Sequence, residues 1–163
     1  MDRKVYDPLI EALDRELKDY YGPRLVTFAI YGSYARNQMR PESDIDILII
    51  ADDLPQGRMK RSAEFLALEK KLGFIKQEFS RQNLYPYLSA IFKTPEEAKR
   101  RPLIFLDMTE EALIFFDRDN FFKNVLEDFR QRLRELGSKR IWKGKMWYWD
   151  LKPDLRPGEV FSL

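Results

Sequence analysis

The chain has 163 residues, enough for one domain with a hydrophobic core. Charged residues make up 34% of it, but the net charge of +2 excludes the strong positive field typical of nucleic-acid coat proteins. Cysteine and histidine are both absent, which excludes disulfides, thiolate or imidazole metal sites, and catalysis by either side chain. Any chemistry must therefore use carboxylates, hydroxyls, lysine, arginine or a bound metal ion.

Two features of the sequence bear on location. No apolar stretch reaches the length of about 18 residues that indicates a membrane-spanning helix. The first residues, Met1 to Lys4, are mostly charged, unlike those of a signal peptide. We therefore expect a cytoplasmic protein that makes no contact with a membrane.

Helices and strands are expected to alternate along the first half of the chain. Apolar residues at helical spacing, or in continuous runs, predict these elements, and glycine and proline mark their ends. In chain order they are a helix at 2–20, a buried strand at 24–31, a short helix from Ser33, a loop at 38–43 containing Pro41, a strand at 45–51, a turn at 52–57 and a helix at about 58–72. The inward face of this last helix is expected to carry Met59, Ala63, Leu66 and either Phe65 or Leu68.

The second half continues the alternation, although residues 73–85 give no clear pattern. The expected elements are a strand at 86–93, a helix from Thr94 with a capping-box sequence, a strand at 112–116, a helix at 120–136, a hairpin at 139–151 turning at Lys143-Gly144-Lys145, and an extended tail. Asp119 is expected to cap the helix at 120–136, and Gly137 to end it. This order predicts an α/β or α+β sheet with helices on one or both faces.

Two aspartates open the strand at 45–51. Asp44 and Asp46 are separated by one residue and precede an apolar run at 47–50. Because a strand points alternate side chains to opposite faces, both carboxylates share a face, about 7 Å apart along the backbone. Such like charges repel, and Mg²⁺ would remove the conflict by binding carboxylates together with substrate phosphates. The structural alternative is a salt bridge from Asp46 to Arg36 or Arg40.

A glycine–serine pair follows the strand at 24–31. At Gly32 no side chain blocks the approach of a phosphate, and the Ser33 hydroxyl and the N–H groups of a first helical turn are suited to bind one. Each residue also has a structural alternative, a tight turn for Gly32 and a helix N-cap for Ser33. Arg36 either reaches a phosphate or lies on the surface. Combined with the two aspartates, the pair predicts a site for a metal–nucleoside triphosphate.

Gly32-Ser33, ten further residues and then Asp44-x-Asp46 resemble the signature of the nucleotidyltransferases related to DNA polymerase beta. More narrowly, the short chain is similar to the minimal nucleotidyltransferases of prokaryotes, the MNT type, many of which are antitoxins or partners of HEPN-domain proteins. The resemblance covers residues 25–51 directly, and the order of elements extends it to about residue 117. It implies an α+β (α/β-like) fold with a mixed sheet of about four strands. We expect a nucleotidyltransferase domain at 1–117, with the C-terminal helix and aromatic hairpin tail at 118–163 packed on it.

The resemblance also implies a reaction. Gly32 and Ser33 would bind the nucleotide phosphates, with Arg36 as a further candidate, while Asp44 and Asp46 would be catalytic and hold Mg²⁺. A nucleotidyl group from a triphosphate, expected to be ATP, would pass to a hydroxyl acceptor with release of pyrophosphate. In HEPN-linked members that are enzymes, that acceptor is a tyrosine of the partner. The alternative is a catalytically weak or inactive nucleotide-binding antitoxin or partner subunit.

Two positions depart from the family pattern. Asn37 stands where members often have glycine, a change that left-handed backbone tolerates. The family's third carboxylate lies on the strand expected at 86–93, which carries Ser89 and no acid. The nearest acids in sequence are Glu78, Glu96 and Asp107. Without a third carboxylate, activity would be reduced, or the chain would bind nucleotide without turning it over.

The C-terminal block at 142–149 is rich in aromatic and basic residues. One interpretation is a hairpin whose aromatic side chains pack on the domain. The other is a stacking platform for a base or an RNA strand, or a contact with a partner. Nucleic-acid binding by this block is therefore a third functional alternative.

Overall fold

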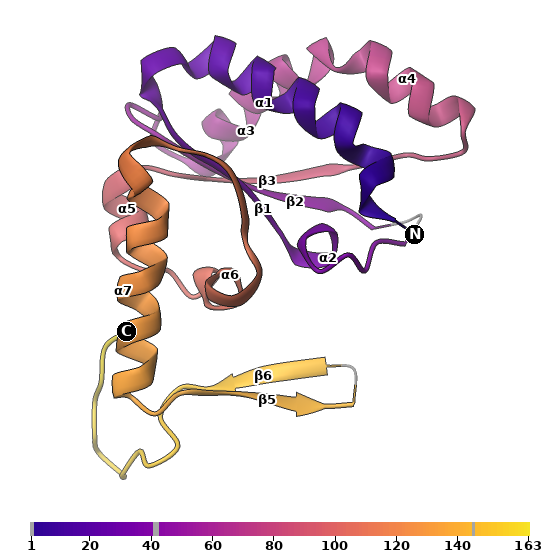
Figure 1. Ribbon diagram of the computed structural model, residues 1–163. Coiled ribbons are helices and arrows are strands. Elements are labelled where there is room, and N and C mark those ends of the chain that lie inside the picture. Colours follow the sequence, from indigo (N-terminus) through magenta and orange to yellow (C-terminus); the bar gives the residue numbers. More distant parts are fainter. Residues whose placement is uncertain (1, 41–42, 145) are drawn as a thin grey trace.

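A four-stranded mixed β-sheet lies at the centre of the protein (Figure 1). Its strands are β1 (Leu25–Tyr31), β2 (Ile45–Ala51), β3 (Leu88–Lys93) and β4 (Leu113–Asp117), in the order β3-β2-β1-β4. β1 is antiparallel to both β2 and β4, whereas β2 and β3 are parallel. The computed structural model describes residues 2–40, 43–144 and 146–163. It confirms the predicted α+β class and the mixed sheet flanked by helices.

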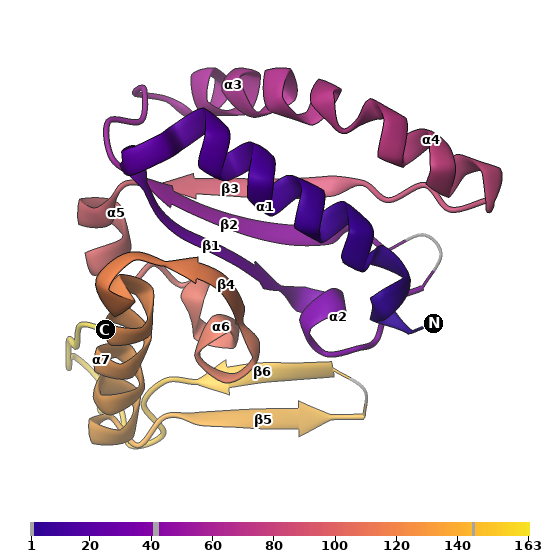
Figure 2. The same ribbon diagram turned by 45° about the horizontal axis from the view of Figure 1, so that its top comes forward.

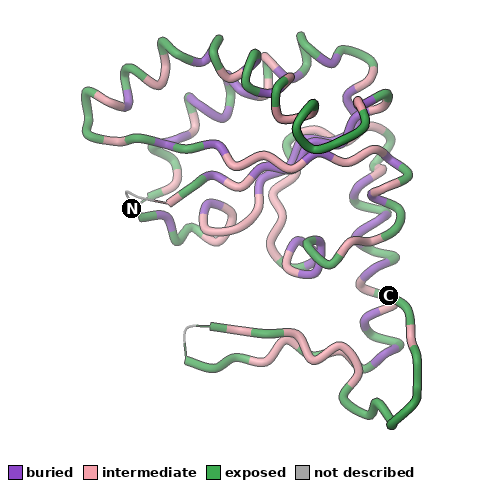
Figure 3. The backbone as a smooth tube through the Cα atoms, turned by 180° about the vertical axis from the view of Figure 1, so that it is seen from behind, coloured by how far each residue is buried: buried purple, intermediate pink, exposed green. Residues whose placement is uncertain are grey.

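Helices cover both faces of the sheet (Figures 1 and 2). The first face packs against α1 (Asp7–Tyr21), α3 (Arg58–Lys71) and α4 (Gly73–Arg81); the second packs against α5 (Pro95–Lys99), α6 (Phe105–Glu111) and α7 (Phe121–Glu135). Short elements join them: α2 (Gly32–Ala35) and the 3₁₀ helices η1 (Arg3–Tyr6), η2 (Gly22–Arg24) and η3 (Arg118–Asn120). Buried residues accordingly concentrate on the central strands and the inward sides of the helices (Figure 3).

The strand β2 contributes to both hydrophobic cores. Ile45, Ile47 and Ile49 lie in the core on the first face, while Leu48 and Ile50 lie in the core on the second. This alternation follows from the two-residue period of a strand. It also assigns Asp46 to the second face, the side of the sheet that α6 and α7 cover.

The structure contains two helices that the sequence pattern does not predict. Residues 73–85 contain α4, and α6 precedes β4. Both are short, with nine and seven residues, and Phe79 is the buried residue of α4. Helices this short contain only about two turns, so the apolar spacing repeats too few times to be recognised. Their stability depends on tertiary packing.

The inward face predicted for α3 is partly wrong. Phe65 and Leu68 are buried as expected, but Met59 is 82% exposed, Leu66 is 56% exposed, and Ala63 is exposed as well. Only a narrow stripe of α3 packs against α1 and β3, so apolar spacing alone overestimates how much of this helix is covered.

Asp117, rather than Asp119, caps α7, so the predicted cap is wrong. The Asp117 carboxylate accepts hydrogen bonds from the backbone N–H groups of Phe122 at 2.9 Å and Lys123 at 3.0 Å. It also accepts one from the hydroxyl of buried Thr27 at 2.9 Å. Asp119 instead adopts left-handed backbone in η3, with φ of 54°. The reason is that η3 lies between the end of β4 and the first turn of α7, which shifts the capping side chain to the strand.

Gly137 ends α7 as predicted. Its φ is +68°, and the N–H of Ser138 donates to the carbonyl of Leu133 at 2.9 Å, the bond typical of a glycine-terminated helix. The predicted capping box at Thr94 is also confirmed: Thr94 and Glu97 exchange side-chain bonds to each other's backbone N–H.

The C-terminal hairpin consists of β5 (Lys139–Lys143) and β6 (Met146–Asp150), as predicted. It extends from the end of α7 along the α6 side of the molecule (Figure 2). Lys145 in its predicted turn, like Pro41 in the predicted loop at 38–43, lies outside the described residues. The division into domains at residues 117 and 118 stays a prediction. None of the helices in the described ranges is long and apolar enough to cross a membrane.

Replacing Asp117 with alanine should lower the free energy of unfolding by about 2–3 kcal/mol, because the Thr27 hydroxyl and two helix N–H groups lose their acceptor. Urea denaturation would measure this. Asp119→Asn is the control, since asparagine also tolerates left-handed backbone, and it should cost less than about 0.5 kcal/mol. A larger loss from the control than from Asp117→Ala would contradict the assignment of the cap.

Candidate functional site

The end of β1 and the start of β2 meet at the Gly-Ser bend. Tyr31 and Asp46 are directly paired across the two antiparallel strands, so Gly32 lies against the Asp46 side chain. A Cβ atom at position 32 would collide with the Asp46 Oδ2 atom and lie 3.2 Å from its Cγ. The backbone φ of Gly32 is +70°, which also favours glycine. Conformation and close approach therefore both require glycine here.

The two aspartates differ in exposure. Asp44 is exposed just before β2, whereas Asp46 is half-buried within it. Burial raises the pKa of Asp46 above its ordinary value, the negative charge of Asp44 raises it further, and the positive charge of Arg36 opposes both. Among the described residues neither aspartate forms an ion pair, so the alternative of a salt bridge to Arg36 or Arg40 is not found.

This pair of carboxylates fits a divalent cation. A half-buried carboxylate without a cationic partner is unfavourable, and a second one nearby adds repulsion. A hard cation such as Mg²⁺ binds to oxygen ligands and would remove both costs. Asp44 and Asp46 are the residues that would hold it, with solvent or a substrate completing its coordination.

Ser33 does not cap α2. The N-cap position is Tyr31 and no side chain caps the helix, while the Ser33 hydroxyl donates to the Met39 sulfur at 3.1 Å. Thioether sulfur is a weak acceptor, so a phosphate oxygen would compete for this hydroxyl easily. Asn37 has φ of 55°, which agrees with the expectation that it replaces glycine in left-handed backbone.

Arg36 is engaged in a network that the sequence did not predict. Its Nη1 atom donates to the Glu111 Oε1 atom at 2.9 Å, and its guanidinium lies 4.9 Å from the centre of the Trp147 ring. Glu111 ends α6, and Trp147 belongs to β6. Neither of the two roles expected for Arg36, a phosphate ligand or a surface residue, included these contacts. Binding of a phosphate by Arg36 stays a prediction.

Ser89 is the residue of β3 that lies beside Asp46. It is paired with Asp46 across the parallel strands β2 and β3. Its side chain therefore points to the same face of the sheet as the Asp46 carboxylate.

The three acids nearest in sequence are held elsewhere. Glu78 lies on α4 and forms an ion pair with Arg81 at 2.7 Å, Glu96 lies in the first turn of α5, and Asp107 accepts two bonds from tryptophan side chains. The described residues contain no group of three or more acidic, histidine or cysteine side chains that could hold a metal ion. In this part of the chain the carboxylate pair therefore stands without a third acid.

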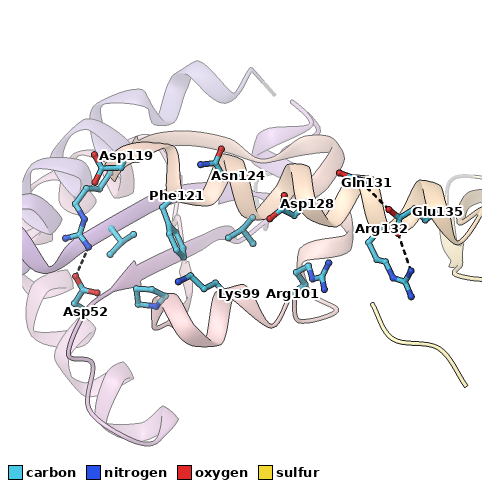
Figure 4. Close-up of a pocket in the computed structure, with 14 residues that line it drawn as sticks. Asp52, Lys99, Arg101, Asp119, Phe121, Asn124, Asp128, Gln131, Arg132 and Glu135 are labelled. Carbon is cyan, nitrogen blue, oxygen red and sulfur yellow. Dashed lines mark hydrogen bonds and ion pairs between the residues drawn. The ribbon is translucent and has the colours of Figure 1, made fainter.

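A cavity of about 830 Å³ lies at the other end of β2, between α5 and α7 (Figure 4). Its lining includes Asp52, Lys99, Phe121 and Asp128. None of the residues predicted from the Gly-Ser and Asp-x-Asp motif contributes to it. The candidate site formed by the motif and this cavity are therefore in separate places.

Comparison with known proteins agrees with the motif. The family model described as a nucleotidyltransferase domain matches residues 10–143. A protein of Methanocaldococcus jannaschii named "Putative protein adenylyltransferase MJ1305" is 31% identical over 153 residues, which cover 90% of this chain and 96% of the relative.

Solved structures of lower similarity include a toxin–antitoxin complex with AMP-PNP, with 17% identity and a TM-score of 0.47 over 78% of this chain and 91% of the other. Another is the toxin–antitoxin MntA-HepT, with 14% identity and a TM-score of 0.44 over 78% of this chain and 89% of the other. The family match and the M. jannaschii relative cover most of the sequence, and on their evidence the chain belongs to the nucleotidyltransferase domain family.

Proposed function

We propose that this nucleotidyltransferase depends on Mg²⁺, takes ATP as its triphosphate and transfers the adenylyl group to a hydroxyl group of a protein. The contact between Gly32 and Asp46 carries the proposal, because it joins a backbone bend free of side chains to a half-buried, unpaired carboxylate. The adenylyltransferase name of the M. jannaschii relative supports both ATP and a protein acceptor.

Each residue of the site has a specific task in this reaction. Asp44 and Asp46 would hold the metal ion, which would offset charge on the phosphates and on the departing pyrophosphate. Because Gly32 has no side chain, the Asp46 carboxylate lies directly against the bend at which the triphosphate would bind, and the Ser33 hydroxyl would donate to one of its oxygens. The acceptor oxygen bonds to the α-phosphorus as the bond to the β-phosphate breaks, and its proton passes to solvent, because Ser89 is not a base.

The acceptor that the family resemblance implies is a tyrosine of a HEPN-domain partner. A phenol hydroxyl suits a site that positions reactants and lacks a third acid, since it gives up its proton more readily than an aliphatic hydroxyl does. The acceptor therefore comes from a second protein in this proposal, and the two would form a toxin–antitoxin pair.

The serine at position 89 favours the alternative function, a partner subunit with little or no transfer activity. With serine beside Asp46 in place of an acid, the chain would bind the nucleotide and its partner while transferring slowly or not at all. Nucleotide binding is common to both candidate functions, and transfer separates them. The alternative is therefore a partner subunit that uses the same fold and the same phosphate site.

Calorimetric titration with ATP should detect binding in Mg²⁺ and none in EDTA. Asp44→Asn and Asp46→Asn should each weaken the Mg²⁺-dependent affinity by about 10- to 100-fold, the effect of losing one charged contact. Asp53→Asn is the matched control, because Asp53 is exposed beyond the other end of β2, and its backbone φ of 54° suits asparagine. Equal ATP binding by all four proteins would overturn the proposal.

Asp46→Asn should also raise the melting temperature in metal-free buffer at neutral pH. The folded protein raises the pKa of Asp46, so ionisation of this group opposes folding above that pKa, and a neutral amide avoids the cost. Thermal unfolding followed by circular dichroism would measure the change. In the wild type the same effect should weaken as the pH falls and Asp46 becomes protonated. A variant that melts below the wild type at neutral pH would argue against a strained carboxylate.

Ser89→Asp should increase the rate of labelled adenylyl transfer to an acceptor protein by about 100-fold or more, the usual effect of a positioned base. Ser89→Asn, of nearly the same size but uncharged, should give no increase. If the wild type is inactive and Ser89→Asp gains transfer, the partner-subunit alternative is favoured for the natural protein. A failure of Ser89→Asp to change the rate would show that this position does not complete the site.

A further inference from the structure

The three tryptophans of the chain share one face of the hairpin β5–β6. Trp142 is paired directly with Trp147, and Arg140 with Trp149, and directly paired residues of antiparallel strands lie on the same side. The Trp142 and Trp147 rings are 5.1 Å apart between centres. The other face carries Ile141 and Tyr148, of which Tyr148 is 54% exposed. The hairpin is therefore two-sided, with its indoles gathered on one side.

Two of these tryptophans attach the hairpin to α6. The indole N–H groups of Trp147 and Trp149 both donate to Oδ1 of Asp107, each at 2.9 Å. Asp107 therefore serves as the acceptor that joins β6 to α6. The two bonds also orient the indole face of the hairpin toward α6, on the second side of the sheet.

Arginine side chains extend this attachment to the candidate site. Two guanidinium groups contact the Trp147 ring, that of Arg36 at 4.9 Å from its centre and that of Arg140 at 4.2 Å. Both arginines approach Oε1 of Glu111, at 2.9 Å and 3.9 Å, and the Glu111 side chain is only 8% exposed. Because Arg36 follows α2 directly, one side chain connects the Gly-Ser bend with the indole face.

The indole face and the aspartates lie on the same side of the sheet. Asp46 alternates with Leu48 and Ile50, which belong to the core that α6 and α7 share with Trp149. Arg36 follows the Gly-Ser bend, where Gly32 lies against the Asp46 carboxylate, and its guanidinium contacts the Trp147 ring. The hairpin β5–β6 lies on the α6 side of the sheet (Figure 2), which is the face to which Asp46 is assigned.

Trp142 is the indole that this attachment leaves uncovered. It is 58% exposed, and the bonds to Asp107 involve the other two tryptophans. Its ring is supported by Trp147 and by the Arg140 guanidinium, 5.1 Å from its centre. Trp142 is thus linked through Trp147 to Arg36, which follows the Gly-Ser bend. Exposed and supported aromatic rings of this kind are those on which nucleic-acid bases stack.

We propose that the hairpin forms the base-binding wall of the nucleotide site and that the purine of the bound triphosphate stacks on Trp142. The inference rests on the proposed function, since it requires a nucleotide at Asp44 and Asp46. It adds a binding residue far along the chain from the motif, and it assigns the exposed indole to the base of the triphosphate.

The test compares ATP with inorganic tripolyphosphate, which has the phosphate chain but no base, by calorimetry in Mg²⁺. Trp142→Ala should weaken ATP binding by roughly five- to 100-fold and leave tripolyphosphate binding unchanged. Trp142→Phe, which retains a ring, should recover most of the ATP affinity. Tyr148→Ala removes an aromatic ring of similar exposure from the opposite face of the hairpin, and should bind both ligands as the wild type does.

The other outcomes distinguish failure of the proposed function from failure of the stacking on Trp142. If the wild type binds neither ligand, the proposed function fails and the inference fails with it. If the wild type binds ATP and Trp142→Ala binds it equally well, the base is elsewhere and only the inference is overturned. Equal weakening of ATP and tripolyphosphate, with an unchanged melting temperature, would assign Trp142 to the phosphate region and also overturn it.

Discussion

The contact between Gly32 and the Asp46 carboxylate is the constraint on which the rest of the site depends. Antiparallel pairing of β1 with β2 places Tyr31 opposite Asp46, so the residue after Tyr31 must turn away with no side chain of its own. The positive φ of Gly32 provides that turn. One strand pairing thus brings a half-buried carboxylate and a glycine bend together, as the proposed binding of a metal–triphosphate requires.

That arrangement is electrostatically unfavourable for an ionised carboxylate. Burial and the neighbouring Asp44 charge both raise the pKa of Asp46, while the positive charge of Arg36 opposes them. The remainder of β2 is fully buried between two cores, which prevents the strand from moving the carboxylate into solvent. Stability elsewhere in the sheet therefore supports a site that is itself unfavourable, as is common at functional centres.

Local signals in the sequence predicted the parts of the structure that depend on local physics. The capping box at Thr94 and the glycine end of α7 involve residues within a few positions of each other, and both were correct. The cap at Asp119 was wrong because the acceptor comes from the end of a strand, and a 3₁₀ turn intervenes. The helices α4 and α6 were missed because tertiary packing, rather than periodicity, stabilises elements this short.

The sequence by itself determined the family, the α+β class and the pairing of a Gly-Ser bend with two aspartates, because these lie within one strand–turn–strand segment whose spacing is fixed along the chain. Only the tertiary structure decided that Ser89 lies beside Asp46, and that Arg36 contacts Glu111 and Trp147. These contacts join residues more than 40 positions apart. Their geometry follows from strand register and from the packing of the hairpin on α6, which no local pattern specifies.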